Sequence, residues 1–160
     1  MARAELSLLL RLIDEAYEQK TWHGPNLRGS LRGVTAKEAA WRAEPGRHSI
    51  WEIAVHAAYW KYTVRRRLLG EKRGSFPLKG SNWFALHQRG SEKEWREHLR
   101  LLDEVHRSMR EAIAILPESR LFVKMPGSKY TYAEALTGIA FHDVYHAGQI
   151  QLLKRLMNAR

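Results

Sequence analysis

Two histidines four residues apart give this chain its clearest chemical signal. His142 and His146 lie in the run FHDVYHAGQI, which covers residues 141–150. No helix-breaking residue interrupts the surrounding stretch, so it predicts one long helix, on which these two side chains project from the same face one turn apart. One helix can then offer two imidazole nitrogens to a single metal ion.

A third histidine is predicted to face the core from another helix. His56 shares its helix face with Ile53 and Trp60, and Ile139 lies on the same side of the later helix as His142. Helix bundles build metal sites from side chains on facing helices. Three neutral imidazoles with an open coordination position suit a divalent ion such as Zn²⁺ or Ni²⁺, which acidifies a bound water.

The same residues have a simpler interpretation. Buried histidines often satisfy their hydrogen bonds without a metal, and His-x-x-x-His alone is a weak motif. The chain contains no cysteine, so any metal must be held by nitrogen and oxygen atoms, and cysteine nucleophiles are excluded. Glycine-rich phosphate loops and a Gly-x-Ser-x-Gly elbow are also absent from the sequence.

Three polar residues near the histidines are candidate catalytic groups. Gln149 can brace a ligand or contact a bound water, or it can bond to a neighbouring helix. Asp143 and Glu52 can each orient an imidazole or act as a general base. The simpler interpretations are a surface carboxylate for Asp143 and a capping-box partner for Glu52. Tyr145 is expected to pack in the core, and Gly148 to permit close helix approach.

Four amphipathic helices must position these side chains. Apolar residues at helical spacing predict main helices over about 3–19, 49–70, 91–116 and 132–157. Four long helices indicate an all-α chain folded as a four-helix bundle. A length of 160 residues fits one domain, expected to cover 1–160.

Shorter signals fill the intervals between these helices. Thr35 and Glu38 fit a capping box for a short helix that ends before Pro45. Residues 24–34 are expected to form a glycine-bearing connector, and 121–125 a short extended piece. Capping-box pairs also mark the starts of the second, third and fourth main helices.

The net charge of the chain indicates which kinds of partner it binds. Lys and Arg number 27 against 17 Asp and Glu, a net charge of +10, which favours a polyanionic partner or an anionic small substrate. The densest basic patch, around Arg65–Arg67, leads into a long connection that contains Trp83 and Phe84. Basic residues beside exposed aromatics can bind single-stranded nucleic acid. The favoured alternative is that these aromatics anchor the connection and the charges are solvated.

The sequence gives no sign of a membrane segment. No apolar run approaches the roughly 20 residues that a membrane span needs, and the first residues include Glu5 and no cleavage-like segment. We therefore expect a soluble, cytoplasmic protein.

The two histidine-bearing segments together resemble the DinB/YfiT-like superfamily. The segments are 142–150 and 49–56, and the resemblance extends to helix order and long connections over nearly the whole chain. It implies a bundle with up-down-down-up topology, usually a homodimer, with a divalent metal held by three histidines. By motif position these ligands are His56, His142 and His146.

The resemblance leaves the reaction open. Some members are S-transferases that use low-molecular-weight thiols, and others are described as metal-dependent hydrolases, so a small-molecule substrate is expected in either case. Two rivals stand beside an enzyme. One is a metal- or ligand-binding stress-response module without turnover, and the less favoured one is a basic nucleic-acid-binding protein.

Overall fold

The computed structural model describes residues 4–86 and 90–159. This part of the chain forms six α-helices and one short 3₁₀ helix. The four long helices are α1 (Ala4–Tyr17), α4 (Ile50–Leu68), α5 (Glu92–Ala114) and α6 (Tyr132–Asn158). The predicted all-α fold with four main helices is therefore confirmed. No described helix is long and apolar enough to cross a membrane.

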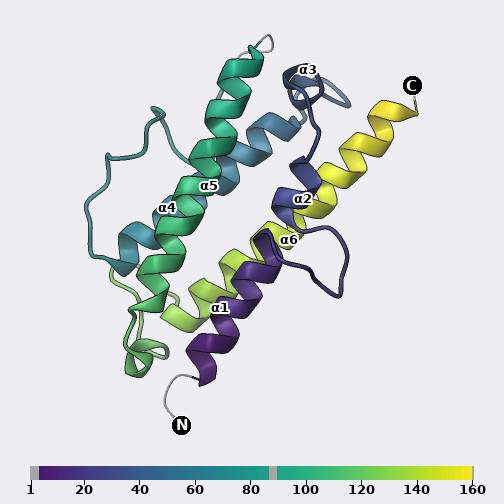
Figure 1. Cartoon of the computed structure of the whole chain (residues 1–160). Helices are drawn as coiled ribbons and strands as arrows, with labels where there is room; N and C mark the ends of the chain where they lie inside the picture. The colour runs from purple at the N-terminus through teal and green to yellow at the C-terminus, as the bar shows by residue number, and fades with distance from the viewer. Residues whose placement is uncertain (1–3, 87–89, 160) are drawn as a thin grey trace.

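The long helices have the predicted up-down-down-up topology. Figure 1 shows α1 and α6 running in one direction and α4 and α5 in the other. Both α4 and α1 pack against α5 and α6, which closes the bundle. Because the consecutive helices α4 and α5 are parallel, the chain between them has to return along the bundle, and this accounts for the length of the connection over 69–91.

Capping boxes start four of the helices. The N-cap hydroxyl accepts a hydrogen bond from the backbone N–H three residues on, and the glutamate there accepts one from the N-cap N–H. These are amides that the first turn of a helix leaves unpaired. The pairs are Thr35 with Glu38, Ser49 with Glu52, Ser91 with Glu94, and Thr131 with Glu134. The predicted starts of α3 (Ala36–Ala40), α4, α5 and α6 are therefore confirmed.

Two short segments differ from the predictions. The connector expected over 24–34 contains a helix, α2 (Leu27–Leu31), capped by the Asn26 side chain, which accepts from the Gly29 amide at 2.8 Å. Five residues are too few to show a helical period. The extended piece expected over 121–125 is mostly turn, following the 3₁₀ helix Glu118–Arg120, and Lys124 makes a single bridge to Thr131.

The core consists of two apolar clusters arranged along the bundle. One contains Ile53 of α4 and Ile150 of α6, and the other contains Val64 of α4 and Ile139 of α6. The three predicted site histidines lie between these positions on their helices. They are therefore held at the level where the two clusters meet, by helices that are packed above and below them.

Candidate metal centre

The three histidines of the sequence prediction come together in the bundle. His142 Nε2 lies 3.1 Å from Nε2 of His56 and 3.1 Å from Nε2 of His146. One nitrogen from each ring falls within 4.8 Å of the other two. Within residues 4–86 and 90–159, no other three His, Asp or Glu side chains converge in this way. His56 and His146 are buried, and His142 is half-buried. A four-residue spacing on α6 and a residue on α4 thus form one cluster.

Two of the rings are braced from behind. His56 Nδ1 lies 2.8 Å from the backbone carbonyl oxygen of Asn82, and His146 Nδ1 lies 2.7 Å from Oε1 of Gln149. Carbonyl and amide oxygens only accept hydrogen bonds, so each Nδ1 carries the proton and donates it. A neutral imidazole has one N–H, so Nε2 of each of these two rings is unprotonated and has a free lone pair. Such support of the second nitrogen is typical of metal-binding histidines.

The facing nitrogens cannot all be satisfied by one another. His142 Nε2 can donate at most one proton, to His56 or to His146, so at least one of these two nitrogens, 3.1 Å away, is left without a donor. His142 Nδ1 is buried and has no hydrogen-bond partner among the described residues. A cation bound between the three Nε2 atoms would accept a lone pair from each of them, which no group in the described core does.

Burial keeps the three rings neutral. It lowers the pKa of His56 to about 4 and the pKa of His142 to about 3, in each case helped by the neighbouring histidines. It also lowers the pKa of His146, although the hydrogen bond to Gln149 opposes this shift. Metal ions bind the neutral imidazole. The cluster therefore presents its ligand form throughout the physiological pH range.

The donor set fits a divalent transition metal. In tetrahedral coordination with metal–nitrogen distances of about 2.0–2.1 Å, neighbouring nitrogens are separated by roughly 3.3 Å. Two of the three separations here, at 3.1 Å, are close to that value. Three imidazoles suit borderline ions such as Zn²⁺ and Ni²⁺ better than Mg²⁺ or Ca²⁺, which prefer oxygen. The residues present thus fit the metal that the sequence predicted.

An aromatic stack covers one side of the cluster, and the sequence prediction missed it. The Trp83 ring is stacked on His56, with centroids 3.8 Å apart, and on His48, with centroids 3.6 Å apart. Trp83 therefore fixes the plane of the His56 ring, while the Asn82 carbonyl fixes its Nδ1. No spacing in the sequence pairs these residues, because the contact depends on how the connection over 69–91 folds back.

The turn before Trp83 has an unusual backbone. Asn82 has a φ of 62°, in the left-handed region that asparagine tolerates better than most residues. Its side-chain Oδ1 accepts a hydrogen bond from Trp60 Nε1 at 3.0 Å. This conformation lets one residue direct its backbone carbonyl at His56 and its side chain at α4. Asn82 and Trp83, which belong to the connection between α4 and α5, are thus part of the site.

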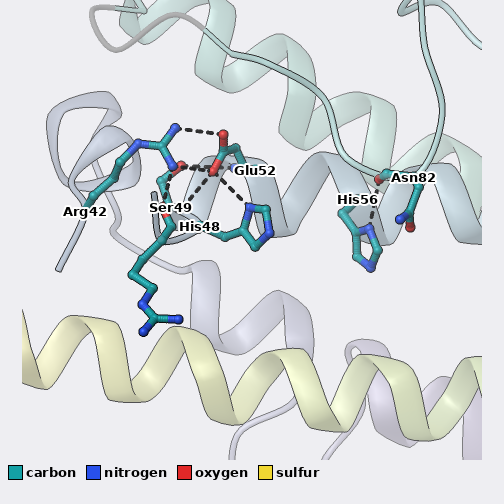
Figure 2. Close-up of polar contacts among 7 residues, drawn as sticks. Arg42, His48, Ser49, Glu52, His56 and Asn82 are labelled. Carbon is teal, nitrogen blue, oxygen red and sulfur yellow. Dashed lines mark hydrogen bonds and ion pairs between the residues drawn. The ribbon is translucent and has the colours of Figure 1, made fainter. Parts of the chain in front are cut away.

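The Glu52 carboxylate is held by hydrogen bonds that do not involve His56. Figure 2 shows its carboxylate turned toward Arg42, His48 and Ser49 rather than toward His56. Both oxygens lie 2.7 Å from Arg42 nitrogens, and the Ser49 amide donates at 3.0 Å. Burial raises the pKa of Glu52, but these hydrogen bonds outweigh it and lower the pKa overall. The capping-box interpretation is therefore the correct one.

Asp143 follows neither sequence interpretation. It is 1% exposed, so the expected surface carboxylate is wrong, and it forms an ion pair with the buried Lys61 of α4. No described imidazole hydrogen-bonds to it; its Oδ1 is buried without a partner. The hydrogen-bond partner of Asp143 among the described residues is Lys61 of α4, and none of the three clustered histidines contacts it by a hydrogen bond.

Gln149 and its neighbours lie at the outer edge of the cluster. Gln149 accepts from His146, as the bracing interpretation expects, and its Nε2 donates to the Tyr145 hydroxyl at 3.1 Å. Tyr145 is 63% exposed, so its expected core position is wrong. A Cβ at Gly148 meets no atom within 4 Å, and close approach of another helix in this chain does not explain this glycine.

The cluster opens onto a pocket of about 680 Å³ between α4 and α6. His142 forms part of its wall together with Trp60, whose ring lies 6.5 Å from that of His142, centroid to centroid. Most of the lining is apolar, with a few polar groups, as in many small-molecule sites. A small molecule in this pocket can therefore reach the half-buried histidine.

The aromatics expected for nucleic-acid stacking are used within the chain. Phe84 is 5% exposed, and Trp83 is stacked between two histidines. Arg65 pairs with Glu71, and Arg66 donates to the Glu71 backbone carbonyl at 2.9 Å. These contacts support the anchoring interpretation of the connection.

Comparison with known proteins places the chain in a family. The model of the DinB superfamily matches residues 19–150, a stretch that includes all of α4 and α5, most of α6 and the three clustered histidines. The comparison with curated proteins gave no match, and neither did the comparison with solved structures. The match covers most of the chain, and the protein belongs to the DinB superfamily.

Proposed function

We propose that this protein is a metal-dependent enzyme that transfers a small thiol to an electrophilic substrate. His56, His142 and His146 hold a divalent ion, Zn²⁺ or Ni²⁺ by donor chemistry. The observation that carries the proposal is the convergence of three Nε2 atoms. Two of them carry no proton, because the Nδ1 atoms of the same rings donate to Asn82 and Gln149. A bound ion supplies one thing here, the acidification of a coordinated thiol or water.

The surroundings of the cluster favour a thiol over water as the nucleophile. Activating water for hydrolysis is most effective with a general base within hydrogen-bond reach. The two candidate carboxylates, Glu52 and Asp143, are paired with Arg42 and Lys61. A free thiol has a pKa of about 8.5 and needs only a modest shift to ionise at neutral pH. Thiol transfer therefore does not require a nearby general base, and hydrolysis is the second candidate.

The access route favours turnover over a purely structural ion. Structural metal sites are closed by four protein ligands, whereas catalytic sites keep an open position. Three histidines leave such a position, and His142 borders the pocket of about 680 Å³. A pocket of this size holds a small substrate next to the ion.

The metal is tested by elemental analysis of the purified protein beside His56→Ala and His142→Ala. We expect close to one equivalent of Zn²⁺ or Ni²⁺ in the parent protein and almost none in either variant. His98→Ala is the matched control, because His98 is half-buried and bonded to Trp51, outside the cluster. Equal metal content in all four proteins contradicts the ligand assignment.

The reaction is tested with the metal-loaded protein and a panel of low-molecular-weight thiols. Transfer to an electrophile such as a chloro-dinitrobenzene is followed by absorbance, and hydrolysis of activated esters is measured in the same preparations. We expect metal-dependent transfer from at least one thiol. Metal-dependent hydrolysis without transfer replaces the leading candidate by the second one, and neither activity with the ion in place removes both.

A further inference from the structure

The pocket beside His142 is a groove with distinct ends. On α4 its wall carries Trp60, Val64 and Arg67, at helical spacing, and on α6 it carries His142, Ile139 and Ala135. The helices are antiparallel, so the Trp60 end meets His142 and the Arg67 end meets Ala135. Trp60 and Arg67 are separated by seven residues, a distance of about 10 Å along the helix. The groove thus joins the histidine cluster to an arginine.

Arg67 differs from the two arginines that precede it. Arg65 and Arg66 are occupied by contacts with Glu71. Arg67 is half-buried, and the described part of the chain offers its guanidinium no hydrogen bond or ion pair. It also borders a second pocket of about 450 Å³, whose lining includes Arg73 and Lys79. The groove also carries the carboxylate of Glu134, which accepts hydrogen bonds from the Thr131 amide and hydroxyl and forms no ion pair with Arg67. A partly buried cation without a bonded anion, beside other cations, is an anion-binding position.

The floor of the groove is left open by a glycine. Gly138 is the seventh residue of α6, inside the helix, where glycine costs about 1 kcal/mol relative to alanine. A Cβ there meets no atom within 4 Å, so no contact inside the chain requires glycine. A longer side chain at position 138 would instead fill the groove between Arg67 and His142. Glycine therefore keeps the groove open where a ligand would lie between these two residues.

We propose that the substrate of this site is an amphipathic anion. Its carboxylate or phosphate binds Arg67, its apolar body of about 10 Å lies over Gly138 and Ile139, and its far end reaches His142. The inference rests on the proposed function, which places the chemistry at the histidine cluster. It assigns Arg67 and Gly138 as specificity residues, and the net charge of +10 draws such a ligand toward the protein.

The test measures binding of decanoate and decyl phosphate by calorimetry, below their micelle concentrations, to the protein as purified and after chelation of metal. Chelation matters because a carboxylate can also coordinate a metal ion directly. Decanol and decyltrimethylammonium are the neutral and cationic controls. We expect both anions to bind, with the cation at least about tenfold weaker, since a charged hydrogen-bonded pair discriminates strongly. Equal binding of all four probes overturns the proposal.

Two pairs of variants locate the ligand. Arg67→Gln is expected to weaken the anions about tenfold and leave decanol unchanged, while Arg66→Gln, a neighbour outside the groove, changes neither. Gly138→Leu is expected to weaken anions and decanol together, while Gly138→Ala keeps binding. Unchanged binding in Arg67→Gln or in Gly138→Leu overturns the assignment.

Metal content, measured in the same preparations, separates this inference from the proposed function. If the protein holds its full complement of metal but ligand binding does not depend on Arg67, the proposed substrate class is wrong and the metal-dependent reaction still stands. Binding that depends on Arg67 in a protein that takes up no metal removes the metal-dependent reaction and leaves the groove assigned.

Discussion

Two polar clusters lie side by side inside this bundle, and they are built in opposite ways. The histidine cluster, the candidate metal centre, has three neutral rings whose nitrogens converge beside a pocket. The second, here called the central polar cluster, contains one residue from each long helix: Tyr17, Lys61, His106 and Asp143. Asp143 follows His142 directly in the sequence, so adjacent residues of α6 serve both.

The central polar cluster is closed and compensates its own charge. Lys61 and His106 are 0% exposed and Asp143 is 1% exposed. Lys61 pairs with Asp143 and lies 4.8 Å above the Tyr17 ring, which is stacked on His106. Burial lowers the pKa of Lys61 and raises the pKa of Asp143, and their mutual attraction opposes both shifts. The comparison teaches that buried polar atoms, even those without hydrogen-bond partners such as the His106 nitrogens, do not mark a site by themselves. The convergence of three ligand atoms beside a pocket does.

The largest expected effect comes from breaking the central ion pair. Lys61→Met leaves Asp143 as a buried, unpaired carboxylate, and removal of one partner of a buried pair costs about 3–5 kcal/mol. We expect a loss of that size in the free energy of unfolding in urea. The double variant Lys61→Met with Asp143→Leu is the control and is expected to recover most of the loss, because both charges are gone. A loss below about 1 kcal/mol for the single variant contradicts a purely buried pair.

If the histidine cluster binds metal as proposed, Gln149→Ala is expected to weaken metal binding and leave the fold intact. Removing a hydrogen-bond partner of a metal-binding histidine weakens metal affinity about 10–100-fold. Gln151→Ala, on the same helix and equally half-buried, is the matched control. Zn²⁺ titration against a competing chelator measures the affinity, and thermal unfolding of the metal-free proteins checks the fold. Equal affinities for the two variants rule out the bracing role of Gln149.

His106→Leu is expected to stabilise the protein. Both ring nitrogens of His106 are buried without partners in the described part of the chain, so an apolar residue of similar size gains about 1–2 kcal/mol at neutral pH. Burial, with Lys61 nearby, lowers the pKa of His106 to about 2. Between that value and 6.5 the unfolded chain binds a proton and the folded chain does not, so stability falls as the pH falls.

The variant also separates the two clusters by pH. In metal-free protein, His106→Leu should lose stability less steeply than the parent from pH 6.5 downward. Part of the slope remains, because the lowered pKa values of His56 and His142 act in the same direction. Urea unfolding at a series of pH values measures both slopes. Parallel curves would show that His106 is not buried as a neutral ring.

The smallest effects concern the outer face of α6, where we expect a second copy to bind, as the family resemblance implies. Phe141 and Tyr145 are each 63% exposed there, Leu152 is 57% exposed, and Gly148 lies between them. Phe141→Glu should shift a homodimer to monomers in sedimentation equilibrium and leave both clusters intact. Gly148→Ala should weaken the dimer, or, if the face is free, raise stability by up to about 1 kcal/mol.

The sequence predicted the framework well because its signals are local. Each capping box lies within four residues, and the helical period of apolar residues repeats over two or more turns, so the long helices were placed closely. His142 and His146 are related by helix geometry alone. His56 could be added because it shares its face with apolar neighbours, and the family resemblance agreed.

What the sequence did not predict depends on contacts between distant segments. Trp83 reaches His56 through a connection that has no period, so nothing local announces the stack. Lys61 and Asp143 are 82 residues apart, and each alone resembles a surface residue, because charged side chains are rarely buried unless paired. Their burial becomes visible only when α4 and α6 are placed together.

The hydrogen bond from His56 to the Asn82 carbonyl makes the imidazole a reporter of loop docking. In metal-free protein, while the segment around Asn82 is docked, the proton of His56 resides on Nδ1. Opening of the connection, a local unfolding event, releases the ring to exchange between its two tautomers. The nitrogen-15 chemical shifts of the His56 ring therefore record how often the connection leaves the bundle. The rate of this opening limits how fast the His56 ring can rotate away from His142 and His146.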